Sequence, residues 1–105
     1  MRKILYSPGY GAGWTSWNDG EVAAYMLEYA PIVEAIENKT FTFSEKDPLC
    51  LQLEKECQEK FGENKHVCLL GADQLRVYET SGRVRINEYD GCESVEEEGG
   101  YQGWM

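Results

Sequence analysis

The segment from Ser7 to Asn18 is the part of this chain whose residue types and spacing could support chemistry. It reads Ser-Pro-Gly-Tyr-Gly-Ala-Gly-Trp-Thr-Ser-Trp-Asn, so three glycines and three large aromatic residues share twelve positions. Glycine allows the backbone to turn sharply and to approach another group closely. Each aromatic ring would bury a large area if something covered it. The combination favours a recognition surface over a simple spacer.

The chemistry that this segment could support is the binding of an anion attached to a ring. Turn amides and the hydroxyls of Ser7, Thr15 and Ser16 could hold a phosphate or carboxylate, while an aromatic side chain stacks on the ring. The candidate ligand-binding residues are Ser7, Gly9, Tyr10, Gly11, Gly13, Trp14, Thr15, Trp17 and Asn18. The alternative is that Trp14 and Trp17 are core residues that anchor a tight glycine turn. The sequence leaves both alternatives open.

The glycines do not form a standard nucleotide-binding motif. The dinucleotide fingerprint needs its glycines at the entrance of a helix within a parallel strand-helix-strand unit, and the triphosphate loop needs a Lys followed by Ser or Thr. Neither pattern is present. We therefore predict no nucleotide cofactor.

The residues that could bind a metal or act as nucleophiles are few and poorly spaced. The chain has four cysteines, none paired as Cys-x-x-Cys, and one histidine, His66, so no metal site is predicted. A nucleophile paired with histidine would have to use His66. Cys92 stands beside Asp90 and Glu93, whose charges disfavour its thiolate. The sequence predicts no catalytic residue and favours a binding protein over an enzyme, although it does not exclude an enzyme.

The charge balance restricts the class of partner. Nineteen acidic residues against ten basic ones give a formal net charge of −9. This excess repels nucleic acid, so direct binding to DNA or RNA is not expected. The same charge suits docking on a basic protein surface, including one that normally holds nucleic acid. We expect either such a protein or a small anionic, ring-containing ligand as the partner, and a homo-oligomer is possible.

The sequence also indicates where the protein works. No apolar run approaches the roughly 18 residues that span a bilayer. Met1-Arg2-Lys3 leads into a short strand rather than the apolar core of a signal peptide. Reduced thiols are the simplest state for the four cysteines. We expect a cytoplasmic protein that does not enter the membrane.

The elements that must position the aromatic loop are a strand before it and helices after it. The run Lys3–Tyr6 predicts a strand, and a helix is predicted to begin near Glu21. Pro31 is expected to kink this helix or to open a second short one. Asp47 is predicted to cap a third helix that ends at Gly62.

The second half of the chain is predicted to be mostly β. Residues 67–70 form a short apolar run typical of a buried strand. Residues 75–80 and 83–89 flank Ser81-Gly82, which favours a hairpin. The whole order predicts a two-layer α+β domain over residues 1–92, with helices packed on one face of a mainly antiparallel sheet of about four strands. Residues 93–105, acidic and then rich in glycine, are predicted to be a mobile tail.

Three stretches together resemble a known group of proteins. They are the opening Tyr-Ser-Pro-Gly-Tyr-Gly-Ala-Gly-Trp of residues 6–14 with Ile4-Leu5 before it, Leu70-Gly71-Ala72, and Ile-Asn-Glu-Tyr-Asp-Gly-Cys-Glu of residues 86–93. In these stretches the chain is similar to a family of small proteins encoded by bacteriophages and prophages, a family without an established activity. The resemblance implies a non-enzymatic factor that acts on host machinery or host defence from the host cytoplasm.

Two hypotheses follow for the function. In the first, the loop 7–18 sequesters a small nucleotide-like ligand, as a host-defence antagonist could do. In the second, the protein is an acidic inhibitor or nucleic-acid mimic that binds a host defence protein or DNA-binding protein.

Overall fold

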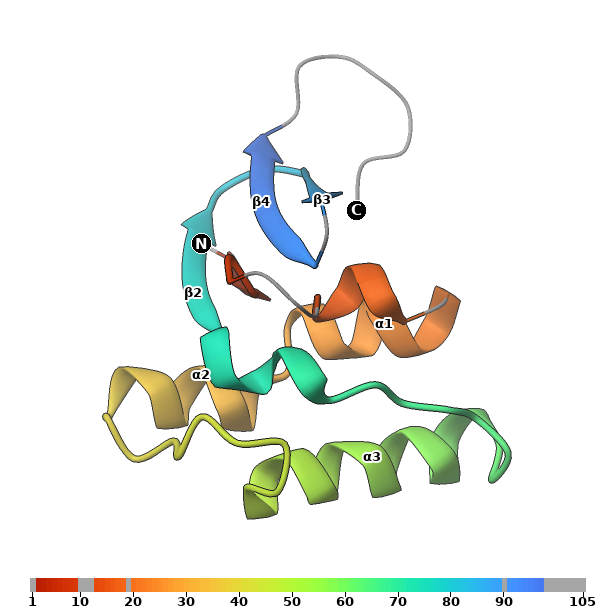
Figure 1. Ribbon diagram of the computed structural model, residues 1–105. Helices are drawn as coiled ribbons and strands as arrows, with labels where there is room; N and C mark the ends of the chain where they lie inside the picture. Colours follow the sequence, from red (N-terminus) through yellow and green to blue (C-terminus); the bar gives the residue numbers. More distant parts are fainter. Residues whose placement is uncertain (1, 10–12, 19, 90, 98–105) are drawn as a thin grey trace.

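The computed structural model describes residues 2–9, 13–18, 20–89 and 91–97. In these residues the chain is a mixed α+β fold, which confirms the predicted fold class (Figure 1). The elements in order are β1 (Arg2–Tyr6), the short 3₁₀ helix η1 (Thr15–Trp17), α1 (Gly20–Leu27), α2 (Ala30–Glu37), α3 (Pro48–Phe61), the 3₁₀ helix η2 (Leu70–Gln74), β2 (Arg76–Thr80), β3 (Val84–Tyr89) and β4 (Cys92–Glu97).

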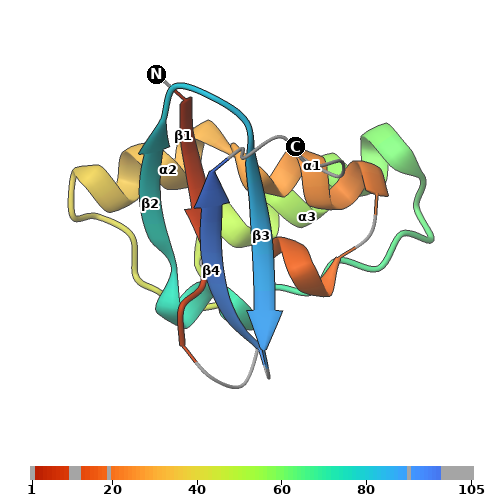
Figure 2. The same ribbon diagram turned by 90° about the horizontal axis from the view of Figure 1, so that it is seen from above.

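The four described strands form two small antiparallel sheets rather than one. β1 pairs with β2, with Leu5 opposite Val77, and β3 pairs with β4, with Ile86 opposite Val95. Figure 2 shows the strands in front of the helices, with β2 and β3 at the two outer edges and β1 and β4 between them. The predicted number and direction of strands are therefore confirmed, whereas the predicted single sheet divides into two pairs.

The predicted hairpin around Ser81-Gly82 is wrong, although both of its strands exist. β2 pairs with β1 from the start of the chain, and β3 pairs with β4. Alternation of apolar and polar residues shows that a segment is a strand, but it does not show which strand lies beside it. The Ser81-Gly82 turn instead connects the two sheets.

The predicted strand at residues 67–70 is also wrong. Within this run the backbone N–H of Cys68 donates to Asn18 Oδ1 at 2.8 Å, and its carbonyl accepts from Asn18 Nδ2 at 3.0 Å. One side-chain amide therefore satisfies both backbone groups that a neighbouring strand would otherwise bind.

The mobile tail predicted for residues 93–105 is wrong for residues 93–97. Residues 93–97 lie in β4, where Glu93 is buried and Val95 is half-buried. A run of glutamates resembles a solvated segment, but alternation along a strand places one of them inside the protein. The rest of the predicted tail, residues 98–105, lies outside the described residues.

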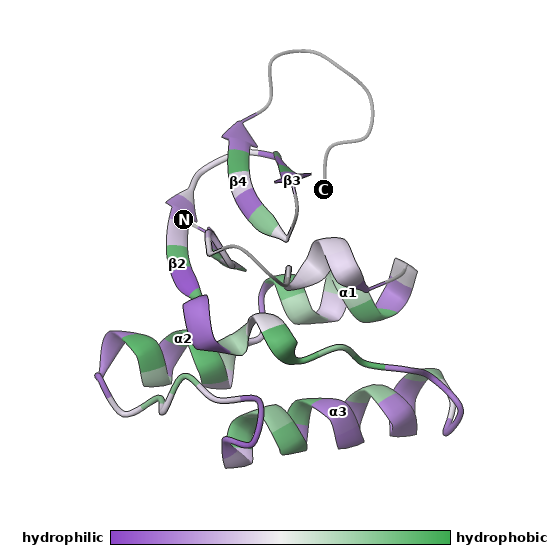
Figure 3. Cartoon of the chain, in the orientation of Figure 1, coloured by the Kyte–Doolittle hydropathy of each residue, from purple (hydrophilic) through white to green (hydrophobic). Residues whose placement is uncertain are grey.

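The positions of the helices agree closely with those predicted from the sequence. Pro31 stands in the first turn of α2, so it opens a second helix rather than kinking the first. Asp47 caps α3, where its Oδ1 accepts from Leu49 N–H at 2.8 Å, and Gly62 follows the last residue. In Figure 3, α3 shows apolar positions alternating with polar ones. Its buried positions are Cys50, Leu53 and Cys57.

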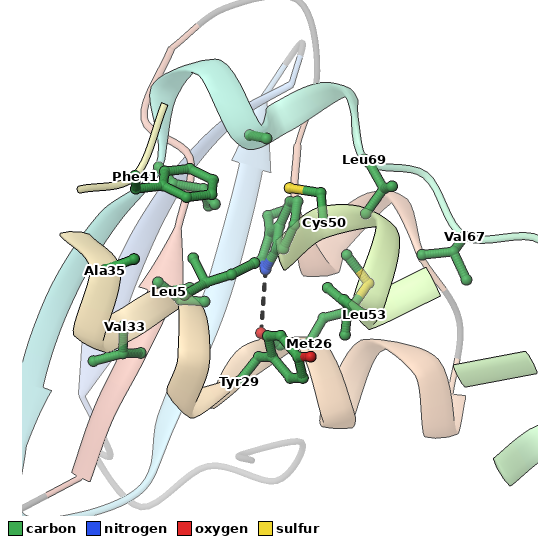
Figure 4. Packing of buried hydrophobic residues seen from close by; sticks show 14 of the residues in the cluster. Leu5, Met26, Tyr29, Val33, Ala35, Phe41, Cys50, Leu53, Val67 and Leu69 are labelled. Atoms are coloured by element: carbon green, nitrogen blue, oxygen red, sulfur yellow. Dashed lines mark hydrogen bonds between the residues drawn. The ribbon is translucent and has the colours of Figure 1, made fainter. Parts of the chain in front are cut away.

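The main core lies between the helices and the first sheet. Figure 4 shows Leu5, Met26 and Leu53 close together in this cluster, and all three are fully buried. Burial raises the pKa of the Cys50 thiol to about 12 and that of Cys57 to about 11, so both act as apolar core residues. In the described part of the chain, no helix has both the length and the apolar character needed to cross a membrane.

Candidate functional site

The candidate site is the loop between β1 and α1 together with Glu93, which reaches it from β4. Glu93 is 1% exposed. Its Oε1 accepts the backbone N–H of Ser7 at 2.8 Å. Its Oε2 accepts the backbone N–H groups of Trp14 at 2.7 Å and Ser16 at 3.0 Å, and the Ser16 hydroxyl at 2.5 Å. One buried carboxylate therefore receives four hydrogen bonds from the loop.

The loop thus has the donors expected of an anion site, but the anion belongs to the chain itself. Successive backbone N–H groups that converge on one point favour a negative charge there. The amides of Ser7, Trp14 and Ser16 all converge on Glu93. An external phosphate or carboxylate could use these three amides only if Glu93 left them.

Close approach explains why Gly13 is a glycine. A Cβ at this position would lie 2.2 Å from Ser16 Oγ, 2.8 Å from Trp17 Cδ1 and 2.9 Å from Glu93 Oε2. These distances are too short for a side chain to be added without a shift of its neighbours. The glycine signal in the sequence therefore does mark a close contact, and the contact is with the Glu93 carboxylate and its donors.

Trp14 is a core residue. Its side chain is fully buried, and its indole N–H donates to the Met26 carbonyl at 3.1 Å, the bond drawn as a dashed line in Figure 4. A buried indole needs such an acceptor. Of the two alternatives for this residue, the core anchor is the one observed, because a ring with no exposed surface cannot stack on a ligand.

Trp17 has the opposite environment. It is 41% exposed, and its indole N–H donates to Glu88 Oε2 at 3.3 Å. The same oxygen accepts the backbone N–H of Gly91 at 2.7 Å. Tyr89, the next residue along β3, is 79% exposed. We call Trp17, Glu88 and Tyr89 the Trp17 patch: an exposed indole, the carboxylate that it binds near the end of β3, and the exposed tyrosine that follows this carboxylate in the strand.

The remaining described candidates of the loop are buried, hydrogen-bonded or closely packed within the protein. Thr15 is 3% exposed, and its hydroxyl oxygen has no hydrogen-bond partner in the part of the chain that the structure describes. Asn18 donates to the Trp14 carbonyl at 2.7 Å as well as binding Cys68. Gly9 lies so close to Gln74 that an added Cβ would be 2.3 Å from Gln74 Cγ. The candidates Tyr10 and Gly11 lie outside the described residues.

No arrangement for metal binding stands out in the site. Among residues 2–9, 13–18, 20–89 and 91–97, no group of three or more His, Cys, Asp or Glu side chains is placed to hold a metal ion. The Cys92 thiol donates to the Pro8 carbonyl at 2.9 Å, which ties β4 to the start of the loop.

Sequence reasoning missed Glu93 and Glu88. Glu88 was part of the strand predicted over residues 83–89 and Glu93 was part of the acidic run, and neither has an unusual local pattern. A weak signal existed, because Glu93 stands two residues before Val95 and shares a strand face with it. An acid on the same face as an apolar residue is a candidate for burial.

No protein-family model matches this chain. No curated protein and no solved structure is significantly similar to it either. The resemblance to bacteriophage and prophage proteins therefore stays a sequence-based expectation.

Proposed function

We propose that this chain is a non-enzymatic acidic binding protein that docks on a basic protein surface through the Trp17 patch. The observation that carries the proposal is the contrast between the two tryptophans of the loop. Trp14 is fully buried, whereas Trp17 remains 41% exposed and donates its indole N–H to the Glu88 carboxylate.

The chemistry of the patch supports a protein partner. Tryptophan and tyrosine are enriched among the residues that contribute most to protein interfaces. Burying the exposed parts of Trp17 and Tyr89 would remove apolar area from water. Glu88 adds a negative charge within a chain whose net charge is −9, which favours a basic partner and accelerates association at low salt.

The small-ligand hypothesis loses its main support at the loop. It relied on free turn amides, but the amides of Ser7, Trp14 and Ser16 bind Glu93. Of the two tryptophans that could stack on a ligand, Trp14 is buried and Trp17 keeps an exposed ring. We therefore prefer the second hypothesis, an inhibitor or mimic of nucleic acid. The resemblance to phage proteins favours a host protein of defence or DNA binding as the target, in the host cytoplasm.

Co-purification with a defined competitor tests the proposal. The immobilised protein should retain a basic host protein that is released by salt, and double-stranded DNA should compete with the immobilised protein for the purified partner. Trp17→Ala should lower the affinity for that partner at least tenfold, about 1.4 kcal/mol. Leu51→Ala is the matched control, because Leu51 is an apolar residue on α3 that is 52% exposed.

Two results would overturn the proposal. One is that the Trp17→Ala and Tyr89→Ala variants retain the partner as strongly as the wild-type protein does. The other is a nucleotide that stabilises the protein in a thermal-shift panel, because a ligand at one hundred times its Kd adds about 2.7 kcal/mol. The second result would restore the small-ligand hypothesis.

A further inference from the structure

We propose that the outer edge of β2 binds an extended basic segment of a partner protein as an added strand. One apolar side chain of that segment would occupy the pocket beside Phe43. This surface is separate from the Trp17 patch: Figure 2 shows β2 and β3 at opposite outer edges of the strands. The inference thus goes beyond the proposed function and does not require the Trp17 patch to bind anything.

The first observation is an open strand edge. β2 pairs with β1 through the register Arg2 opposite Thr80 to Tyr6 opposite Arg76, and no other described strand pairs with it. In an antiparallel pair, successive residues alternate between bonding to the partner strand and pointing their N–H and C=O groups away from it. Such an edge is a template for another extended chain.

The second observation is a pocket at the start of this edge. Its volume is about 490 Å³, and its apolar lining comes from Tyr6, Ile36, Phe43, Leu75 and Val77. The carboxylate of Asp73 also lines it. Peptides that add a strand to a sheet gain affinity from main-chain hydrogen bonds and specificity from side-chain pockets beside the edge. The pocket and the open edge share Val77 and Arg76, so one peptide can use both.

The third observation is the conformation of Phe43. Its φ is 54°, in the left-handed region that bulky residues rarely adopt. Its side chain is 40% exposed, and its ring makes an edge contact with Phe41 at 5.1 Å between centroids. Residues held in strained backbone conformations cluster at binding and active sites, and this ring lines the pocket.

Charge decides which occupant fits. A second copy of this chain would bring another −9 to the edge, which opposes self-association. Asp73 precedes β2, and Glu79, which lies on it, is exposed. Glu79 already lies 4.0 Å from Lys3 Nζ, but it is exposed and can accept a second cation. The two carboxylates lie on either side of Arg76, so each can receive a cationic side chain of an added strand. The occupant is therefore an extended segment with basic residues around an apolar one.

A capped peptide, acetyl-Lys-Thr-Val-Phe-Val-Thr-Lys-amide, is the probe. Titrated into the ¹⁵N-labelled protein, it should shift the amide resonances of residues 76–80 and of Phe43 in a saturable way. A peptide with N-methyl groups on alternate residues cannot complete the ladder and should bind at least tenfold more weakly. A peptide with Glu in place of both Lys should also bind more weakly. Absence of saturable shifts at residues 76–80 at millimolar peptide would overturn the proposal.

Two glycine variants distinguish the contribution of the pocket to peptide binding from the effect of the strained backbone at Phe43. Phe43→Gly removes the ring and relieves the positive φ, so the protein should remain folded while peptide affinity falls at least fivefold. Lys39→Gly relieves a positive φ of 59° at a residue that does not line the pocket, and should leave affinity unchanged. Equal affinity for both variants would contradict the role of the pocket. Trp17→Ala should bind the peptide normally, so this experiment and the test of the Trp17 patch can fail independently.

Discussion

Ser7 and Glu93 exchange two hydrogen bonds between the end of β1 and the start of β4. The N–H of Ser7 donates to Glu93 Oε1 at 2.8 Å, and the N–H of Glu93 donates to the Ser7 carbonyl at 2.8 Å. The other carboxylate oxygen of Glu93 holds Trp14 and Ser16. This one acidic residue therefore joins the two sheets and holds Ser7, Trp14 and Ser16 of the aromatic loop.

Glu93→Gln should destabilise the protein by about 2–3 kcal/mol. Both carboxylate oxygens accept hydrogen bonds, and the amide NH₂ of glutamine would place a donor against N–H donors in a buried site. Urea denaturation measures the loss. Glu96→Gln is the control, because Glu96 pairs with Arg85 at 2.6 Å on a partly exposed face and such pairs contribute about 1 kcal/mol or less. Equal losses of unfolding free energy in the two variants would show that the hydrogen bonds of Glu93 stabilise the protein no more than an exposed ion pair does.

Gly13→Ala should destabilise the protein by about 1–3 kcal/mol through overpacking, because the added methyl group would meet the Ser16 hydroxyl and the Glu93 carboxylate. Gly82→Ala is the matched control. An added Cβ at Gly82 has nothing within 4 Å, and this variant should be neutral or slightly stabilising, since alanine restricts the unfolded chain. Thermal unfolding of both variants checks the difference, and a Gly13→Ala protein as stable as wild type would contradict the tight contact.

Trp14 and Trp17 should respond differently to the same substitution. Trp14→Phe should cost about 2 kcal/mol or more, because it removes buried area and the hydrogen bond to the Met26 carbonyl. Trp17→Phe should change stability by about 0.5 kcal/mol or less, as is usual at an exposed site. In a Trp104→Phe background, acrylamide should quench the fluorescence of Trp17 and spare that of Trp14. Equal quenching would place both rings in the same environment.

Stability should depend on pH through Glu56, which joins α1 and α3. Its carboxylate accepts the hydroxyls of Tyr25 at 2.5 Å and Tyr29 at 2.8 Å and the amide of Gln52 at 2.8 Å. These hydrogen bonds, that of Tyr25 first, hold the pKa of Glu56 below its ordinary 4.5. The bond to Glu56 raises the pKa of Tyr25 from 10.0 to about 12. Burial, followed by Glu56, raises that of Tyr29.

The directions of these pKa shifts determine how stability changes with pH. The contribution of ionised Glu56 is present above pH 4.5 and is lost as pH falls through its lowered pKa. The contribution of the neutral tyrosines is present below pH 10.0 and is lost as pH rises toward about 12. The difference in unfolding free energy between wild type and Glu56→Gln should be constant between about pH 5 and 9 and shrink on both sides. The control Glu59→Gln, at an exposed position of α3, should leave the profile unchanged.

Short-range signals in the sequence determined the helices and the positions of most strands. Asp47, Pro31 and Gly62 act within one helical turn of their own position, so the bounds of α2 and α3 could be predicted. The close approach that a glycine indicates was also predictable, and Gly13 does require one, although to Ser16, Trp17 and Glu93 of the same chain. The α+β class followed from the order of these elements.

The tertiary structure alone decided strand pairing and the role of the loop. Ser7 and Glu93 are 86 positions apart, and nothing near either residue in the sequence indicates the other. Pairing of β2 with β1, burial of Glu93 and the division of the two tryptophans between core and surface all depend on such distant contacts. An acidic residue in a charge run has the composition of a solvated segment, and only the donors that fold around it make burial favourable.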